Sequence, residues 1–361
     1  MGGALRIGVI GVGNISAQYF ESLPRLGGLE LVAVADLDAV RASKVATAHG
    51  VRALTVDELL GSSDIDAVLN LTVPAAHVEV GLRALAAGKH VYAEKPFGLG
   101  TESARALLDA QVGGLRVGSA PDTVLGTGVQ TARRALDDGL IGEPVGAAVH
   151  WSSAGHERWH PSPGFYYQPG GGPLFDMGPY YLTSLVTLFG PLVRVSGSAT
   201  RSSRARVVAG GAEAGTTLPV DVDTHVTAVL EHASGVTSTI TMSFDVWATK
   251  TPLFEVYGTA GTLLMPDPNH FADTASVWTS DQPNWTELEV SAGYRDAGRG
   301  VGLADMAEAI ANKTPHRASA ELGFHVLEIM EAVLIASANH RVVELTSSVD
   351  RPAPVVLGDT P

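Results

Sequence analysis

A glycine-rich turn follows the first apolar run of the chain. The run LRIGVI (residues 5–10) leads into Gly11, Gly13 and Ser16, which have G-x-G-x-x-S spacing. Gly11 permits a tight turn, and Gly13 lets a pyrophosphate approach the backbone at the N-terminus of a helix, where negative charge is favoured. Ser16 is small enough for the close contact between helix and strand that a third glycine usually allows. The turn therefore predicts the start of a dinucleotide-binding domain.

A carboxylate ends the second apolar run. Asp36 follows Ser16 by 20 residues, a position from which it can accept hydrogen bonds from the adenosine ribose and would repel the extra phosphate of NADP. Its neighbour Asp38 is better placed to cap the helix expected from Ala39. We therefore expect NAD rather than NADP as the cofactor. The predicted cofactor-binding residues of this region are Gly11, Gly13, Asn14, Ile15 and Asp36.

Short apolar runs alternate with helical patterns through the first third of the chain. Helices are expected at about residues 15–23, 39–49, 75–87 and 102–112, between strands such as LELVAVAD, AVLNLTV and HVYAE. This alternation, with near-continuous apolar strands, predicts an α/β Rossmann domain in which helices cover both faces of a parallel sheet.

The pattern changes near Gly146. Longer alternating runs, including HVTAVLEH and VTSTITMSFDVW, predict an α+β domain with a large, mostly antiparallel open sheet. The segment near 196–217 is expected to be a loop or mobile insertion, and helices at about 303–312 and 320–339 close the chain. The predicted domains are 1–122 for dinucleotide binding and 123–361 for substrate binding and oligomerisation. The second face of the open sheet predicts a homo-oligomer, either a dimer or a tetramer.

Composition excludes several classes of protein. The chain has 24 basic and 38 acidic residues, a formal charge of −14, which provides no basic surface for nucleic acid or for an anionic membrane. It has no cysteine, which excludes disulfides, thiolate catalysis and thiolate metal sites. The apolar run near the start fits a strand better than a signal peptide, and no apolar stretch approaches the roughly 20 residues of a membrane span. We expect a cytoplasmic protein.

A second motif lies at the end of a predicted strand. Gly88 is placed to end a helix, HVYAE forms the strand, and Glu94, Lys95 and Pro96 follow at its carboxyl end, where open parallel sheets bind their ligands. Together with the glycine-rich turn and the preceding TVPAAHVEVGLRALAAGKHV, this motif resembles the glucose-fructose oxidoreductase/inositol dehydrogenase (Gfo/Idh/MocA) family over essentially the whole chain. The resemblance implies a nicotinamide-dependent oxidoreductase acting on sugars, inositols or related polyols.

The same resemblance implies roles for individual residues. Lys95 corresponds to the family's lysine that contacts the reacting substrate oxygen. Lys95 is also expected to belong to the cofactor site, and Glu94 is expected to shape the turn. Thr72, Pro74 and His77 match the segment that lines the nicotinamide side; His77 could equally be an ordinary packed imidazole.

A third motif departs from the family pattern. Relatives usually carry D-x-G-x-H-x-x-D where this chain has Asp176, Gly178, Tyr180 and Thr183. Tyr180 thus replaces the usual His, as it does in glucose-fructose oxidoreductase and dihydrodiol dehydrogenases. A phenol titrates near ~10 in water, and an ammonium such as Lys95 favours the phenolate. We expect Tyr180 to act as acid/base, Lys95 to stabilise the oxyanion and Asp176 to hold hydroxyls or orient its neighbours. Alternatively, Tyr180 merely packs a helix start.

The run His156-Glu157-Arg158-Trp159-His160 has the letters of the H-E-x-x-H zinc motif. That motif requires a helix, whereas a glycine precedes this run and prolines follow it at 161 and 163. A substrate loop is the preferred interpretation, in which Trp159 stacks on a sugar and His156, Glu157 and His160 bind hydroxyls. A structural loop with surface histidines is the main alternative, a metal site is a minor one, and no metal ligands are assigned.

Three further hypotheses stay open. Asp122, at the end of the fifth predicted strand pattern, is a candidate substrate contact or a cap for the helix starting at Thr123. As an alternative to a dehydrogenase, the chain could be an NAD-dependent, redox-assisted glycosidase. It could also be a catalytically inactive protein that binds sugar and NAD, because fold does not determine function.

Overall fold

The computed structural model describes residues 3–211 and 213–361 and divides into two compact units. Unit 1 comprises the chain up to Gln130 with Ser291–Phe324 and Pro352–Pro361, and unit 2 comprises Thr131–Val290 with His325–Arg351. The predicted boundary at residue 122 treated each domain as one continuous segment. It missed the two later segments that return to unit 1.

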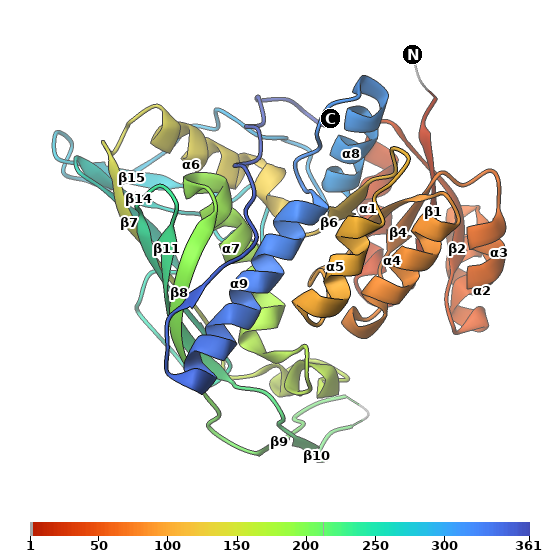
Figure 1. The fold of residues 1–361 in the computed structure, drawn as a ribbon, viewed down its shortest axis with the longest axis horizontal. Coiled ribbons are helices and arrows are strands. Elements are labelled where there is room, and N and C mark those ends of the chain that lie inside the picture. Colours follow the sequence, from red (N-terminus) through yellow and green to blue (C-terminus); the bar gives the residue numbers. More distant parts are fainter. Residues whose placement is uncertain (1–2, 212) are drawn as a thin grey trace. The chain divides into compact units, whose positions relative to one another are not determined.

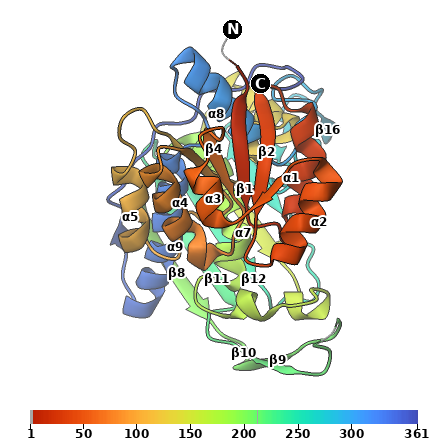
Figure 2. The same ribbon diagram turned by 90° about the vertical axis from the view of Figure 1, so that its right-hand side faces the viewer.

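Unit 1 contains a six-stranded parallel sheet of order β3-β2-β1-β4-β5-β6. Helices α1 and α2 lie on one side of this sheet and α4 and α5 on the other (Figures 1 and 2). The predicted Rossmann domain is therefore confirmed. Its elements are β1 (Leu5–Ile10), α1 (Ser16–Ser22), β2 (Leu29–Ala35), α2 (Ala39–His49), β3 (Arg52–Leu54), α3 (Val56–Gly61), β4 (Ala67–Asn70), α4 (His77–Ala86), β5 (His90–Ala93), α5 (Thr101–Asp109), β6 (Val117–Ser119) and α8 (Val301–Asn312).

Local signals explain where the helices of unit 1 begin. The Asp38 side chain accepts hydrogen bonds from the backbone N–H groups of Val40 and Arg41, which caps α2 at the predicted position. Thr55 and Glu58 form a reciprocal capping box at α3. The sequence analysis did not identify α3 or the short strand before it, because neither extends far enough to show a clear period.

Helix α8 belongs to unit 1 because its apolar face completes the core beside the parallel sheet. Leu303 and Met306 are fully buried in the same cluster as Ile7, Leu69 and Tyr92. Burying large apolar side chains strongly favours folding, so this late segment of the chain packs with the first domain.

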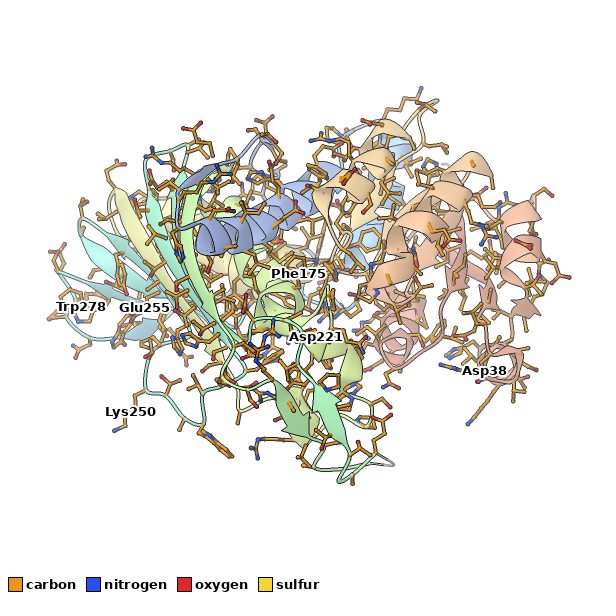
Figure 3. All side chains as sticks on the ribbon, turned by 60° about the horizontal axis from the view of Figure 1, so that its bottom comes forward. Asp38, Phe175, Asp221, Lys250, Glu255 and Trp278 are labelled. Atoms are coloured by element: carbon orange, nitrogen blue, oxygen red, sulfur yellow. The ribbon has the colours of Figure 1, made fainter. Side chains whose placement is uncertain are left out.

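Unit 2 is built on a nine-stranded sheet of order β16-β15-β14-β13-β7-β12-β11-β8-β17. Strands β7 and β12 pair in parallel, and the other neighbours pair antiparallel, as predicted. Glu255 and Trp278 mark this sheet in Figure 3. The strands are β7 (Pro144–Ser152), β8 (Leu192–Thr200), β11 (His225–His232), β12 (Thr237–Ser243), β13 (Phe254–Gly258), β14 (Gly261–Leu264), β15 (Ser276–Thr279), β16 (Thr286–Glu287) and β17 (Val343–Glu344).

A long, almost entirely buried helix packs against the middle of this sheet. Helix α7 (Gly172–Phe189) contacts β11 and β12, and nearly all of its residues are buried. It carries the third sequence motif, and Phe175 marks it in Figure 3. Two of the crossings between the units lie within α6 (Thr127–Asp137) and α9 (Ala320–Asn339), and the other two lie at residues 290–291 and 351–352.

The segment near 196–217 differs from the expected loop. It starts within β8 and continues into an antiparallel hairpin of β9 (Ala205–Val207) and β10 (Thr217–Pro219), visible in Figure 1. Val208 is buried beside this hairpin. The Gly- and Ala-rich composition hid the hairpin, since each strand has only three residues. Across the described ranges, no helix is both long and apolar enough for a membrane span.

Candidate functional site

The glycine-rich turn of unit 1 has the geometry that a dinucleotide requires. Gly11 has a φ of +92°, and a Cβ there would lie 2.7 Å from the carbonyl oxygen of Leu71, so only glycine fits without strain. A Cβ on Gly13 would meet no atom within 4 Å, which leaves its backbone open to a ligand. Asn14 and Ile15 lead from this turn into α1. These residues fit a bound dinucleotide.

Asp36 connects the turn to the end of β2. Its Oδ2 accepts a hydrogen bond of 2.8 Å from the backbone N–H of Val12, and its Oδ1 accepts one of 2.8 Å from the N–H of Asp38. The Arg41 guanidinium lies 3.9 Å from Asp36 and 3.3 Å from Asp38. The sequence analysis missed Arg41, whose position one helical turn after Asp38 was the available signal. Arg41 offsets part of the negative charge of Asp36 and Asp38.

A buried polar network joins the ends of β4 and β5. Asn70 is fully buried; its Oδ1 accepts a 2.7 Å hydrogen bond from the Thr72 hydroxyl, and its Nδ2 donates to the carbonyl of His77 at 3.1 Å. The two ring nitrogens of His77 each lie 2.9 Å from a carbonyl oxygen, those of Pro96 and Thr72. Burial lowers the pKa of His77, although these carbonyls oppose the shift. Pro74 starts the 3₁₀ turn Pro74–Ala76, which lies between Thr72 and His77 in the chain.

Asn70 is a second residue that the sequence analysis missed. It is a polar residue at the end of an otherwise apolar strand, and that contrast was the signal that could have identified it.

Glu94 fixes the turn that carries Lys95. Its buried carboxylate accepts a 2.8 Å hydrogen bond from the Tyr19 hydroxyl and one of 2.9 Å from the backbone N–H of Lys95. Burial, followed by the charge of Glu94, raises the pKa of Tyr19 well above its ordinary value, so the phenol stays protonated as a donor. Lys95 itself is half-buried. The turn is therefore held by one hydrogen bond from α1 and by one within the turn itself.

Asp122 has a different environment from both expectations. It is completely buried, and its Oδ2 accepts hydrogen bonds from the backbone N–H groups of Gly300 (2.8 Å) and Gly302 (3.1 Å), at the start of α8. Its side chain makes no cap for the turn at Thr123. Burial raises the pKa of Asp122, against the effects of Arg299 and the two N–H groups. The carboxylate anchors α8, and we do not propose it as a substrate contact.

The third motif lies along α7 of unit 2. Asp176 and Tyr180 are one helical turn apart, and Tyr180 is only 4% exposed. The adjacent Tyr181 donates a 3.3 Å hydrogen bond to Asp267. Thr183, the last position of the motif, is buried and provides a hydroxyl in place of a carboxylate. Each of the two tyrosines buries a phenol ring on neighbouring positions of one helix, which makes them a matched pair for mutation.

The 156–160 run does not form an α-helix. Residues 156–158 make a single 3₁₀ turn, and the absence of an α-helix here agrees with the flanking glycine and prolines. His156 is buried, and its Nε2 lies 2.8 Å from Oδ2 of Asp176, so two candidate residues meet here. Trp159 is 62% exposed, whereas His160 is half-buried and accepts a 3.1 Å hydrogen bond from the N–H of Ser162. In residues 3–211 and 213–361, no three acidic or histidine side chains form a metal-binding group.

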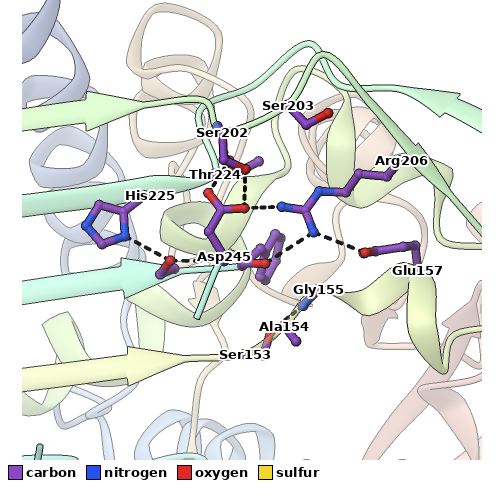
Figure 4. Close-up of polar contacts among 12 residues, drawn as sticks. Ser153, Ala154, Gly155, Glu157, Ser202, Ser203, Arg206, Thr224, His225 and Asp245 are labelled. Atoms are coloured by element: carbon purple, nitrogen blue, oxygen red, sulfur yellow. Dashed lines mark hydrogen bonds and ion pairs between the residues drawn. The ribbon is translucent and has the colours of Figure 1, made fainter. Parts of the chain in front are cut away.

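Glu157 is part of an ionic network rather than an open loop (Figure 4). Its Oε1 lies 3.1 Å from a guanidinium nitrogen of Arg206, which also pairs with Asp245. The Tyr167 hydroxyl donates to the same carboxylate, and burial raises the pKa of Tyr167. Glu157 therefore fixes the 156–160 run to the β9–β10 hairpin, and its carboxylate is not proposed as a sugar ligand.

Two family models match the chain. The model described as "Oxidoreductase family, NAD-binding Rossmann fold" matches residues 5–113, and the model described as "GFO/IDH/MocA C-terminal domain" matches residues 129–264. Both models belong to the same family. One describes its NAD-binding Rossmann domain and the other its C-terminal domain.

Curated relatives match over part of their length. The chain is 36% identical over 168 residues to inositol 2-dehydrogenase 3 of Saccharopolyspora erythraea, covering 43% of this chain and 48% of that protein. It is 33% identical over 147 residues to 1,5-anhydro-D-fructose reductase of Ensifer adhaerens, covering 40% and 44%. The matches thus span about half the length of these relatives.

Solved structures match the whole fold. An NAD-binding oxidoreductase from Klebsiella pneumoniae superimposes with a TM-score of 0.82 at 22% identity, over 96% of this chain and all of that chain. A levoglucosan dehydrogenase in complex with NADH gives 0.81 at 19% identity, over 95% and 100%. At these identities the similarity shows the fold.

Replacing Asp122 separates a structural role from a substrate role. Asp122→Ala leaves the N–H groups of Gly300 and Gly302 without their acceptor, so we expect the free energy of unfolding to fall by about 1–3 kcal/mol. Asp109→Ala removes an exposed carboxylate of the same unit and should change it by less than about 0.5 kcal/mol. Chemical denaturation measures both. Unchanged stability in Asp122→Ala would contradict the anchoring role.

Proposed function

Because the chain belongs to the GFO/IDH/MocA family of oxidoreductases, we propose that it is an NAD-dependent dehydrogenase or reductase acting on a sugar, glycoside or inositol-type substrate. The reaction would transfer a hydride between the nicotinamide and a ring hydroxyl or ketone. The observation that supports this most directly is the turn at Glu94 and Lys95, held at the carboxyl edge of the sheet that also carries the glycine-rich turn. Ligands bind at this edge in doubly wound sheets.

The chain supplies the polar groups that this chemistry needs. When bound, NAD accepts or returns a hydride at C4 of its nicotinamide. We propose that Lys95 stabilises negative charge on the substrate oxygen and that Tyr180 removes or returns the hydroxyl proton. Asp176 would bind the neighbouring hydroxyls, with Trp159 and His160 as further sugar contacts.

Cofactor binding is assigned to unit 1. Gly11, Gly13, Asn14 and Ile15 would approach the pyrophosphate, and Asp36 would accept hydrogen bonds from the ribose. The remaining proposed contacts, on the nicotinamide side, are Thr72, Pro74, His77, Glu94 and Lys95. The carboxylate of Asp36 supports NAD over NADP, because the extra phosphate would meet its negative charge.

The first prediction concerns turnover. Purified protein with NAD should generate reduced nicotinamide on at least one member of a panel of pyranoses, glycosides, anhydrosugars and inositols. Lys95→Met should then lower kcat by about 10²–10³-fold because a charged oxyanion donor is lost. Tyr180→Phe should lower it by about 10²–10⁴-fold while NAD still binds. Absorbance of the reduced nicotinamide measures the rates, and fluorescence titration measures NAD binding.

Tyr181→Phe is the matched control for Tyr180→Phe. It removes one buried phenol hydroxyl from the next position of the same helix, and kcat should stay within about threefold of wild type, since no role in the chemistry is assigned to it. Equal losses in the two variants would contradict a specific acid/base role for Tyr180. Silence of the wild type with both NAD and NADP on every substrate would contradict the dehydrogenase.

The second prediction concerns cofactor choice. Asp36→Asn keeps an oxygen that can accept from the Val12 N–H but removes the negative charge. The ratio of NAD to NADP affinity should therefore shift toward NADP by at least about tenfold, with Arg41 available for the extra phosphate. Asp57→Asn removes an equal charge from an exposed site of the same unit and should leave the ratio unchanged. A wild-type preference for NADP would contradict the assignment.

We also propose that the chain forms a homo-oligomer through the open sheet of unit 2. Along β11 the exposed Thr227 and Val229 alternate with the buried Val226, Ala228 and Leu230, so one sheet face stays uncovered within unit 2. Exposed apolar surface of this kind often forms the interface between two protein chains.

Solution mass tests the oligomer. Light scattering should give a multiple of the 37.4 kDa chain mass, and Val229→Glu should shift it toward the monomer because the charge would be buried. Val112→Glu, at an exposed site in unit 1, should leave the mass unchanged. A monomeric wild type would refute the proposal.

A further inference from the structure

We propose that His156 is a positioning residue for Asp176. In this arrangement its Nε2–H donates to the Asp176 carboxylate and holds it in the orientation that the substrate site requires. The inference deepens the proposed function and rests on it, since Asp176 is assigned there to substrate hydroxyls. His156 lies outside both the glycine-rich turn and the motif on α7.

The contact itself is short and sheltered. Nε2 of His156 lies 2.8 Å from Oδ2 of Asp176, and the two side chains are 7% and 12% exposed. The pair connects the 3₁₀ turn at residues 156–158 with α7, which are separate elements of unit 2. A hydrogen bond to an ionised group in a sheltered place is stronger than a neutral one. The pair is thus able to fix a side-chain orientation.

Aromatic rings enclose the imidazole of His156. The ring centroids of Tyr166, Phe244 and Trp159 lie 4.4, 4.5 and 5.0 Å from its own, and that of Trp151 lies at 6.1 Å. The backbone N–H of His156 also donates to the Tyr167 hydroxyl at 3.1 Å. The imidazole therefore cannot turn away from Asp176 without displacing packed rings, which is costly in a dense interior.

The surroundings also favour one tautomer. An ionised carboxylate only accepts hydrogen bonds, so the proton must be on Nε2 for the contact to be favourable. Nδ1 is buried and has no hydrogen-bond partner in the described part of the chain. A proton on Nδ1 would have no acceptor there, which is costly. The geometry therefore supports the Nε2–H form.

Fixing Oδ2 fixes the whole carboxylate, because that group is planar. Asp176 precedes Tyr180 by one helical turn, on the same side of α7. The orientation of the carboxylate thus affects how a hydroxyl bound to it is presented to the proposed acid/base. Trp159 is exposed, and its ring also contacts that of His156, so His156 touches both the proposed sugar-stacking side chain and the carboxylate.

Paired substitutions test this role. His156→Phe keeps a ring but removes the donor, and kcat/KM should fall by about 10- to 100-fold, the usual effect of a misplaced binding group. His156→Gln can place an amide N–H near the position of Nε2 and should restore kcat/KM to within about threefold of wild type. NAD affinity, which belongs to unit 1, should be unchanged in both. If His156→Phe does not fold, His156→Asn replaces it, since its shorter amide reaches only the Nδ1 position.

A surface pair gives the control. His270 contacts Asp273 at 2.7 Å with both side chains about half exposed, so His270→Gln should leave kcat/KM unchanged. A folded His156→Phe with wild-type kcat/KM would overturn the proposal. Equal impairment of the Gln and non-donor variants would also overturn it, because the loss would then reflect packing.

A readout without substrate separates this inference from the proposed function. ¹⁵N NMR of histidine-labelled protein should show His156 protonated at Nε2, with a resonance that moves in Asp176→Asn. Protonation at Nδ1, or no response to Asp176→Asn, would overturn the inference. If the NMR result holds but no substrate is turned over, the dehydrogenase proposal fails and the role of His156 in catalysis fails with it.

Discussion

Carboxylates that accept hydrogen bonds from backbone N–H groups fix the turns at the carboxyl edge of the parallel sheet in unit 1. Asp36 fixes the glycine-rich turn through Val12, Glu94 fixes the turn at Lys95, and Asp122 anchors the start of α8. In each case the side chain comes from the end of a strand and the N–H from a turn or helix start. Because charged hydrogen bonds are strong where water is excluded, these contacts determine the shape of the ligand-binding edge of the sheet.

The fold was largely predictable from the sequence because its signals are local. Apolar strands followed by helical periods predicted the Rossmann sheet, and alternating runs predicted the open sheet of unit 2. The return of α8 to unit 1 was not predictable in this way, since Leu303 packs with residues nearly 300 positions earlier. The three-residue strands of the β9–β10 hairpin were also too short to show a period.

The site was predictable in residue type more than in contacts. The motifs identified Asp36, Glu94 and Asp176, but the partners of these carboxylates come from other elements. Asp122 looked like a ligand contact because it follows a strand, yet its Oδ2 accepts hydrogen bonds from two backbone N–H groups at the start of α8. His156 was expected at a sugar, and its contact with Asp176 could not be read from the sequence. Such pairings depend on tertiary packing, which a single sequence does not display.

The central claim is that this chain moves a hydride between a ring carbon and the nicotinamide, and isotope transfer tests it most directly. The protein is incubated with NAD and a substrate that it turns over, deuterated at each ring carbon in turn, and the reduced cofactor is analysed by mass spectrometry. We predict one deuterium in the reduced nicotinamide for one labelled position and none for the others. Reduced cofactor without deuterium from any position would contradict the claim.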